Sequence, residues 1–217
     1  MTREAKPLWH RLVAVGAIMT GLALPLLATR GLTVFTADSA RARDVAAHPR
    51  VVPAVTLLDA DSMVRPLGSP GAALIVDFIA TRCQTLCAAQ NGVYQQLQRR
   101  IRDAGLTGRI QLVTISFDPV WDTPRALRYF ALAQHPDPAV WTVLTPADTG
   151  QLRPLLDTFG VRVVREGAEF VHNTALHVVS AEGRLVAIVP IDEPDTALAL
   201  ALQRAASSVP AVPSGGR

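Results

Sequence analysis

The chain has 217 residues, of which 49% are hydrophobic and 18% charged, a composition typical of one globular domain with an extension. The net charge of +3 belongs to the leader up to Asp44, which holds six Arg and Lys residues against three acids and leaves fifteen of each for the remainder. Because the remainder is neutral overall, the net charge does not indicate nucleic-acid binding, which needs a concentrated basic face, and we expect no nucleic-acid partner.

The N-terminal part predicts a membrane anchor. Arg3, Lys6 and Arg11 precede an apolar run from Leu12 to Ala28, about 26 Å long as a helix and just enough to cross a thin bilayer. The residues after this run fit a signal-peptidase site poorly, so we expect an uncleaved anchor rather than a signal peptide. The preceding cations keep the N-terminus in the cytoplasm. We therefore expect a single-pass inner-membrane protein whose C-terminal domain is periplasmic.

Four regions follow from the composition along the chain. We expect the anchor over residues 1–30, a polar tether over 31–50, one folded domain over 51–205 and a flexible tail rich in Ser, Pro and Gly over 206–217.

Within the folded domain, apolar runs alternate with segments of helical spacing. The expected order is a small hairpin over 51–67, a strand to Ala80, a helix over 85–104, a strand over 110–117, a helix opened by Thr123 and Pro124, a strand over 140–144, a helix over 147–159, two strands over 175–179 and 184–189, and a closing helix over 195–204. This alternation predicts an α/β protein of thioredoxin-like fold, with a mixed sheet flanked by helices on both faces.

The chain has two cysteines, Cys83 and Cys87, and both fall where the strand ending at Ala80 meets the next helix. Four residues apart at the start of a helix, their sulfurs are expected on one face, and the helix dipole there favours thiolate over thiol. The alternative is a short structural disulfide or two unrelated core cysteines. A bridge across so short a loop removes little chain entropy, which favours a reactive or metal-binding pair.

Three segments and a histidine carry a family resemblance. The stretches 78–87, 114–124 and 140–145, with His172 standing eleven residues before Gly183, resemble the Sco/SenC family of copper proteins. The resemblance spans roughly residues 52–204 and implies copper binding by Cys83, Cys87 and His172. It also implies that Asp118 lies beside the copper site. The chain departs from the family pattern at Ala80, Gln84, Ala88 and Pro146, and these departures put its redox poise, partner and client in doubt.

The same donor set indicates a soft metal without the family. Two thiolates and one imidazole suit Cu(I), with Cu(II) as the alternative oxidation state, whereas a structural zinc site would need a fourth protein ligand. His177 is the rival imidazole. In a strand, a side chain five positions from His172 would tend to the opposite face, which favours His172.

Three charged residues near the cysteines have competing interpretations. Asp118 either lies beside the metal or forms an Asx turn before Pro119. Asp122 is interpreted as a cap of the next helix, a role that Thr123 would also fill. Arg82 either lowers the pKa of the neighbouring thiol or is simply solvated.

The leading functional hypothesis is a membrane-tethered copper metallochaperone. By resemblance, its client is the cytochrome c oxidase subunit that bears the dinuclear copper site, and an upstream copper donor and a thiol reductant serve as further partners. The alternative is a thiol–disulfide oxidoreductase that reduces the cysteines of the target site, or a thiol redox sensor. The Cys-x-x-x-Cys spacing is wider than that of a thioredoxin, and residues 163–189 hold no proline to face the pair, so an enzymatic role is the weaker interpretation.

Overall fold

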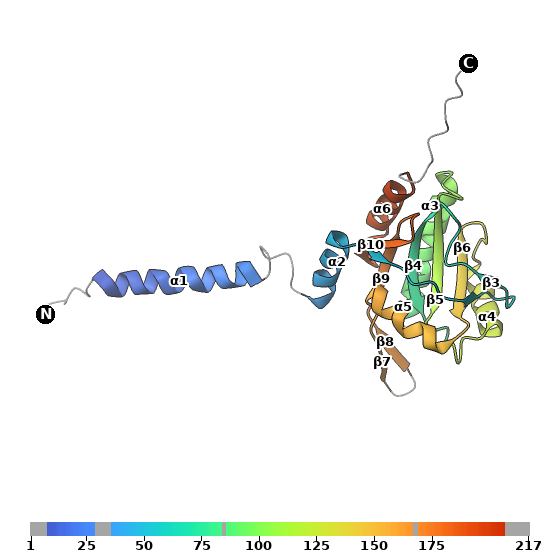
Figure 1. Cartoon of the computed structure of the whole chain (residues 1–217), viewed down its shortest axis with the longest axis horizontal. Coiled ribbons are helices and arrows are strands. Elements are labelled where there is room, and N and C mark those ends of the chain that lie inside the picture. Colours follow the sequence, from blue (N-terminus) through green and yellow to red (C-terminus); the bar gives the residue numbers. More distant parts are fainter. Residues whose placement is uncertain (1–7, 29–35, 84–85, 167–168, 207–217) are drawn as a thin grey trace, which may run out of the picture. The chain divides into compact units, whose positions relative to one another are not determined.

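The structure is a computed structural model that describes residues 8–28, 36–83, 86–166 and 169–206 (Figure 1). The chain divides into two compact units, residues 1–43 and 44–217. Of the tail expected over 206–217, Ala206 ends the last helix and the rest lies outside the described residues.

The first unit holds α1 (Leu8–Ala28) and most of α2 (Ala37–Ala47). Across the described residues, no helix combines the length and apolar character that a membrane crossing requires. Part of the expected tether is helical. Thr36 and Ser39 exchange backbone-to-side-chain hydrogen bonds of 3.1 and 3.2 Å, which caps the start of α2. Residues 37–47 of the expected tether over 31–50 therefore form a helix.

The second unit is built on an eight-stranded mixed sheet in the order β1-β10-β9-β4-β5-β6-β2-β3. The three strands β4, β5 and β6 are parallel, and the other pairs are antiparallel. The strands are β1 (Arg50–Val51), β2 (Leu57–Leu58), β3 (Val64–Arg65), β4 (Ala73–Ile79), β5 (Ile110–Ser116), β6 (Trp141–Pro146), β9 (Ala175–Val179) and β10 (Arg184–Pro190).

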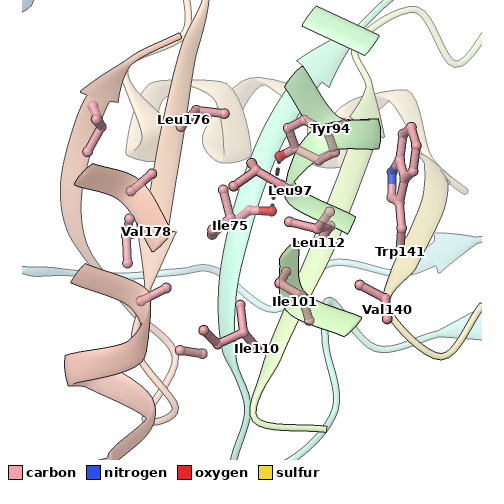
Figure 2. Close-up of a cluster of buried hydrophobic side chains, with 14 of the residues drawn as sticks. Ile75, Tyr94, Leu97, Ile101, Ile110, Leu112, Val140, Trp141, Leu176 and Val178 are labelled. Carbon is pink, nitrogen blue, oxygen red and sulfur yellow. Dashed lines mark hydrogen bonds between the residues drawn. The ribbon is translucent and has the colours of Figure 1, made fainter. Parts of the chain in front are cut away.

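Helices cover both faces of this sheet. They are α3 (Leu86–Asp103), α4 (Pro124–Gln134), the short η1 (Thr149–Gln151), α5 (Leu152–Phe159) and α6 (Pro194–Ala206). One core cluster lies between the sheet and α3, α4 and α6, and Figure 2 shows part of it, with Leu97 and Ile101 of α3 beside Ile75 and Leu112. The other cluster packs α5 and Val45 of α2 against the opposite face. The predicted α/β thioredoxin-like architecture is confirmed.

A second, two-stranded sheet was not predicted. Strands β7 (Val163–Glu166) and β8 (Glu169–His172) pair antiparallel with each other and form a hairpin separate from the eight-stranded sheet (Figure 1). Its sequence is short and carries charges at Arg165, Glu166 and Glu169, so it lacks the apolar run of a buried strand. The hairpin ends on His172 and therefore matters for the site.

Strand β4 is buried along its whole length, yet it carries a carboxyl group at Asp77. One oxygen of Asp77 accepts a hydrogen bond of 2.8 Å from the amide of Gln90 on α3. The other oxygen is buried, and none of the described residues forms a hydrogen bond with it. Burial raises the pKa of Asp77 to about 7, because the apolar surroundings disfavour the charged form.

We predict that Asp77 makes the fold less stable as pH rises. Between about pH 4 and pH 7 the unfolded chain loses the Asp77 proton while the folded chain keeps it, so the free energy of unfolding falls by up to about 1.4 kcal/mol per pH unit from this group. Urea unfolding at several pH values should show this slope, and Asp77→Asn should flatten it. An Asp77→Asn variant with the slope of the wild type would contradict the assignment.

Candidate metal centre

The cysteine loop leaves the carboxyl end of β4, at the centre of the sheet. The amide of Cys83 donates a hydrogen bond of 3.0 Å to the carbonyl of Ala80, which closes a tight turn. The Cys83 side chain carries a free thiol, is half-buried and contacts both core clusters. Helix α3 begins at Leu86, so Cys83 precedes it and only Cys87 lies in its first turn. Both cysteines lie where β4 gives way to α3, as expected, although only Cys87 is in the helix itself. The side chain of Cys87 is not among those that the structure describes.

A buried carboxylate fastens this loop to the loop after β5. Asp122 is fully buried and accepts three hydrogen bonds, from the amide of Thr81 at 2.9 Å, the hydroxyl of Thr81 at 2.5 Å and the hydroxyl of Ser116 at 2.6 Å. The interpretation of Asp122 as a cap of α4 is wrong. Thr123 occupies the N-cap position without a side-chain hydrogen bond, and Pro124 starts the helix. Sequence reasoning missed this contact because Thr81 and Asp122 are 41 residues apart.

A second carboxylate reaches the cysteine loop from the same β5–α4 loop. Asp118 pairs with the guanidinium group of Arg82 at 2.7 Å, and the Asp118 side chain is only 13% exposed. The Asp118 amide donates to the hydroxyl of Ser116 at 3.0 Å, which links this residue to the Asp122 network. Arg82 is thus paired rather than solvated. Asp118 thus lies next to the cysteine loop.

His172 is held at the end of the β7–β8 hairpin by its neighbour. The side chain of Asn173 accepts a hydrogen bond from the amide of Arg162 at 2.7 Å and donates to the carbonyl of Gly160 at 3.2 Å, which fixes the base of the hairpin. The His172 ring packs edge-on against Phe117, with 4.9 Å between ring centroids. Phe117 lies directly before Asp118, so the histidine approaches the β5–α4 loop.

The chemistry of His172 is that of a neutral imidazole with one nitrogen free. The residue is 6% exposed, and desolvation lowers its pKa. Its Nδ1 lies 3.3 Å from the Asn173 carbonyl, a geometry that suits an Nδ1–H donor, while Nε2 is buried and has no hydrogen-bond partner in the described part of the chain. A buried unpaired nitrogen costs free energy, and an unprotonated imidazole nitrogen is a metal ligand.

His177, the rival imidazole, belongs to the core. It lies on β9 between Phe78 and Phe159, with ring centroids 5.6 and 5.3 Å away, and its Nδ1 is 3.1 Å from the carbonyl of Val76. Because His172 ends β8 and His177 lies on β9, strand alternation does not relate the two side chains. The argument from strand alternation for preferring His172 is therefore wrong. The two rings still differ in their surroundings, because His177 is packed between two core phenylalanines and Nε2 of His172 has no partner among the described residues.

The structure brings the cysteine loop, the Asp118 loop and the histidine hairpin to one end of the sheet. Among the side chains that the structure describes, no group of three or more His, Cys, Asp or Glu residues is arranged to hold a metal ion. The predicted donor set includes Cys87, whose side chain is not among them. What the described residues offer is a half-buried thiol at Cys83 and a free imidazole nitrogen at His172.

Comparisons with known proteins agree with this architecture. The SCO1/SenC family model matches residues 47–207. A SCO1 protein homolog of Bacillus subtilis (strain 168) is 25% identical over 119 residues, which cover 54% of this chain and 61% of that relative, so the match spans less than two thirds of the relative.

Solved structures show the same fold. BsSco, a member of the Sco family of cytochrome c oxidase assembly proteins in which a disulfide switch was identified, has a TM-score of 0.64 at 21% identity, with 73% of this chain and 95% of BsSco covered. ScoI of Bradyrhizobium japonicum, solved with copper bound, has a TM-score of 0.58 at 19% identity, with 71% and 99% covered. At these identities the likeness shows the fold alone.

We predict that Asp122 is a major source of stability at this end of the sheet. Asp122→Ala would leave the amide and hydroxyl of Thr81 and the hydroxyl of Ser116 without their acceptor, so the free energy of unfolding should fall by about 3 kcal/mol. Asp122→Asn, which keeps one oxygen, should lose less. Asp157→Ala is the control, because its carboxylate is 64% exposed and pairs only on the surface of α5. Equal losses for Asp122→Ala and Asp157→Ala in urea unfolding would contradict the prediction.

Proposed function

Since the chain belongs to the SCO1/SenC family, we propose that it is a copper-binding protein that assists the assembly of cytochrome c oxidase. Copper is the cargo, held by Cys83, Cys87 and His172. The observation that carries the proposal is the buried Nε2 of His172, which has no hydrogen-bond partner among the described residues. The copper-bound ScoI structure and the oxidase-assembly role of the Sco family support the same assignment.

The residues present fit a soft metal. Thiolates select Cu(I), and the desolvated imidazole of His172 stays neutral at physiological pH because burial lowers its pKa. Cys87 lies in the first turn of α3, where the unpaired amides of the helix favour an anionic sulfur. The aromatic ring of Phe117 packs against His172 and restricts its orientation. Copper binding requires both sulfurs in the reduced form, so a disulfide between Cys83 and Cys87 excludes the metal.

A second candidate function is thiol–disulfide exchange with the client. A pocket of about 390 Å³ lies between α3 and α4 and borders Cys83, with Ala126, Tyr129 and Phe130 of α4 among its lining residues. The pocket leaves the Cys83 thiol accessible to a cysteine of a client protein, and thiol–disulfide exchange requires such access. The disulfide switch of BsSco favours the same interpretation of the pair.

We also propose that the protein is tethered to the inner membrane with its folded unit in the periplasm. The support is the apolar run from Leu12 to Ala28 after Arg3, Lys6 and Arg11. An oxidising compartment would make the redox state of the cysteine pair depend on a reductant. The partners are then the oxidase subunit with the dinuclear copper site, a copper donor and a thiol reductant.

We predict that reduced protein comprising residues 44–217 binds one Cu(I), and that oxidation of the cysteine pair abolishes binding. The reason is that a disulfide removes two of the three donors. Competition with a Cu(I) chelator should show one equivalent with reductant and none after oxidation. The Cys83→Ser, Cys87→Ser double variant should bind none, and full stoichiometry in that variant would refute the site.

The histidines provide the matched pair in the same assay. His172→Ala should weaken Cu(I) binding by at least about ten-fold, about 1.4 kcal/mol, while both thiols stay titratable. His177→Ala should leave the affinity unchanged and lower stability, because it removes a ring packed between Phe78 and Phe159. Wild-type affinity in His172→Ala would favour thiol exchange over copper carriage.

We predict that the full chain, expressed in a bacterial host, fractionates with the inner membrane and resists extraction by high salt. Its C-terminus should be digested by protease added to spheroplasts, since the cations before residue 12 hold the N-terminus in the cytoplasm. Deletion of residues 1–30 should release the protein into the soluble fraction. Recovery of a shortened, freely soluble form from the full chain would show cleavage instead of anchoring.

A further inference from the structure

We propose that Arg82 is the positioning residue that holds the histidine hairpin against the cysteine loop. This inference rests on the proposed copper site and assigns the element that sets its geometry. Arg82 lies directly before Cys83, and its side chain is 28% exposed. Because the two residues are adjacent, contacts that fix the Arg82 side chain also restrain the backbone that carries the thiol.

Arg82 contacts the β5–α4 loop through two residues. Its guanidinium group pairs with Asp118 at 2.7 Å and lies 5.1 Å from the centroid of the Trp121 ring. The pair with Asp118 is largely shielded from water, and the flat guanidinium group suits both the carboxylate and the aromatic face. These contacts orient the guanidinium group relative to the loop that ends at Asp122.

The same guanidinium group also reaches the hairpin. Its central carbon lies 5.0 Å from the centroid of the Phe170 ring, within the range of a cation–π contact. Phe170 is two residues before His172, and both rings pack edge-on against Phe117, at 5.5 and 4.9 Å between centroids. Arg82 and Phe117 thus hold the hairpin from two segments, and Arg82 is the one that comes from the cysteine loop.

The hairpin depends on such contacts because its strands pair with each other and not with the eight-stranded sheet. At its base, Asn173 bonds to Arg162 and Gly160, which fixes where the hairpin starts. These bonds do not determine how far the hairpin leans toward the cysteine loop. Side-chain packing must therefore determine it. Phe117 supplies part of that restraint, and the Arg82 to Phe170 contact supplies the part that ties the hairpin to the cysteine loop.

Arginine is required for this role because its group must act on three partners together. A lysine ammonium keeps the charge, yet it is a point charge that cannot lie flat on Trp121 and Phe170 while pairing with Asp118. An Arg82→Lys substitution would therefore retain the ion pair and lose the link to the hairpin. This difference separates positioning from a simple electrostatic effect of the charge on the thiol.

A double-mutant cycle with His172 tests the proposal. Arg82→Ala and Arg82→Lys should each weaken Cu(I) binding by about ten-fold, about 1.4 kcal/mol. In a His172→Ala background the same substitutions should change the affinity by less than about two-fold, because the restraint then has no ligand to position. Arg125→Ala is the control, since Arg125 lies over Tyr129 on α4 at 5.9 Å, and it should leave the affinity unchanged.

A second arm needs no copper. Amide hydrogen exchange of the reduced, metal-free protein should show faster exchange in 163–172 for Arg82→Lys and for Phe170→Leu than for the wild type, with the exchange of β4 and β5 unchanged. If wild-type protein binds no Cu(I), the proposed function fails, and this arm still decides the role of Arg82. Unchanged exchange in the hairpin, or equal losses of copper affinity with and without His172, would overturn the proposal. Should Arg82→Ala not fold, Arg82→Lys and Phe170→Leu carry both arms.

Discussion

The candidate site depends on one buried carboxylate. The loop after β4 leaves the centre of the sheet at a point where backbone and hydroxyl groups would be buried without partners, and Asp122 accepts two hydrogen bonds from Thr81 and one from Ser116. Because Ser116 ends β5, the carboxylate joins the ends of two adjacent parallel strands. The turn that carries Cys83 is therefore fixed to the rigid sheet.

The restraints on the site become weaker with distance from the Asp122 hydrogen bonds. Asp118 and Arg82 join the same two loops by an ion pair that is partly exposed, and Arg82 reaches the hairpin through an aromatic contact of 5.0 Å. Hydrogen bonds to a buried carboxylate are worth more than a cation–π contact at a partly exposed residue. The thiol of Cys83 thus has the firmest support and His172 the most adjustable, an arrangement that suits the proposed role in carrying copper.

The sequence predicted the elements that are governed by apolar periodicity. Strands β4 and β5 and helix α3 follow from runs that only a buried strand or an amphipathic helix explains, and Pro124 marks the start of α4. Two elements were not predicted, for related reasons. Helix α2 buries only Val45, and the strands β7 and β8 are four residues long, so neither element has an apolar pattern long enough to give a periodic signal. The partners of Asp122 could not be predicted because tertiary contacts between distant loops leave no local pattern, while a Thr-Pro helix start nearby suggested a local role.

At Asp77 and His172, a buried polar atom has no partner among the residues that the structure describes, which departs from the rule that buried groups are paired. At Asp77, the cost is met by retaining the proton, as the raised pKa of about 7 indicates, and the carboxyl group stays part of the structural core. At His172, protonation is disfavoured instead, because burial lowers the pKa of the imidazole. A proton on Nε2 would also have no hydrogen-bond acceptor among the described residues. The same physical cost therefore has opposite outcomes. The carboxyl group becomes neutral by binding a proton, whereas the imidazole stays neutral with its lone pair available, and under the proposed function a metal ion is the partner that relieves this cost.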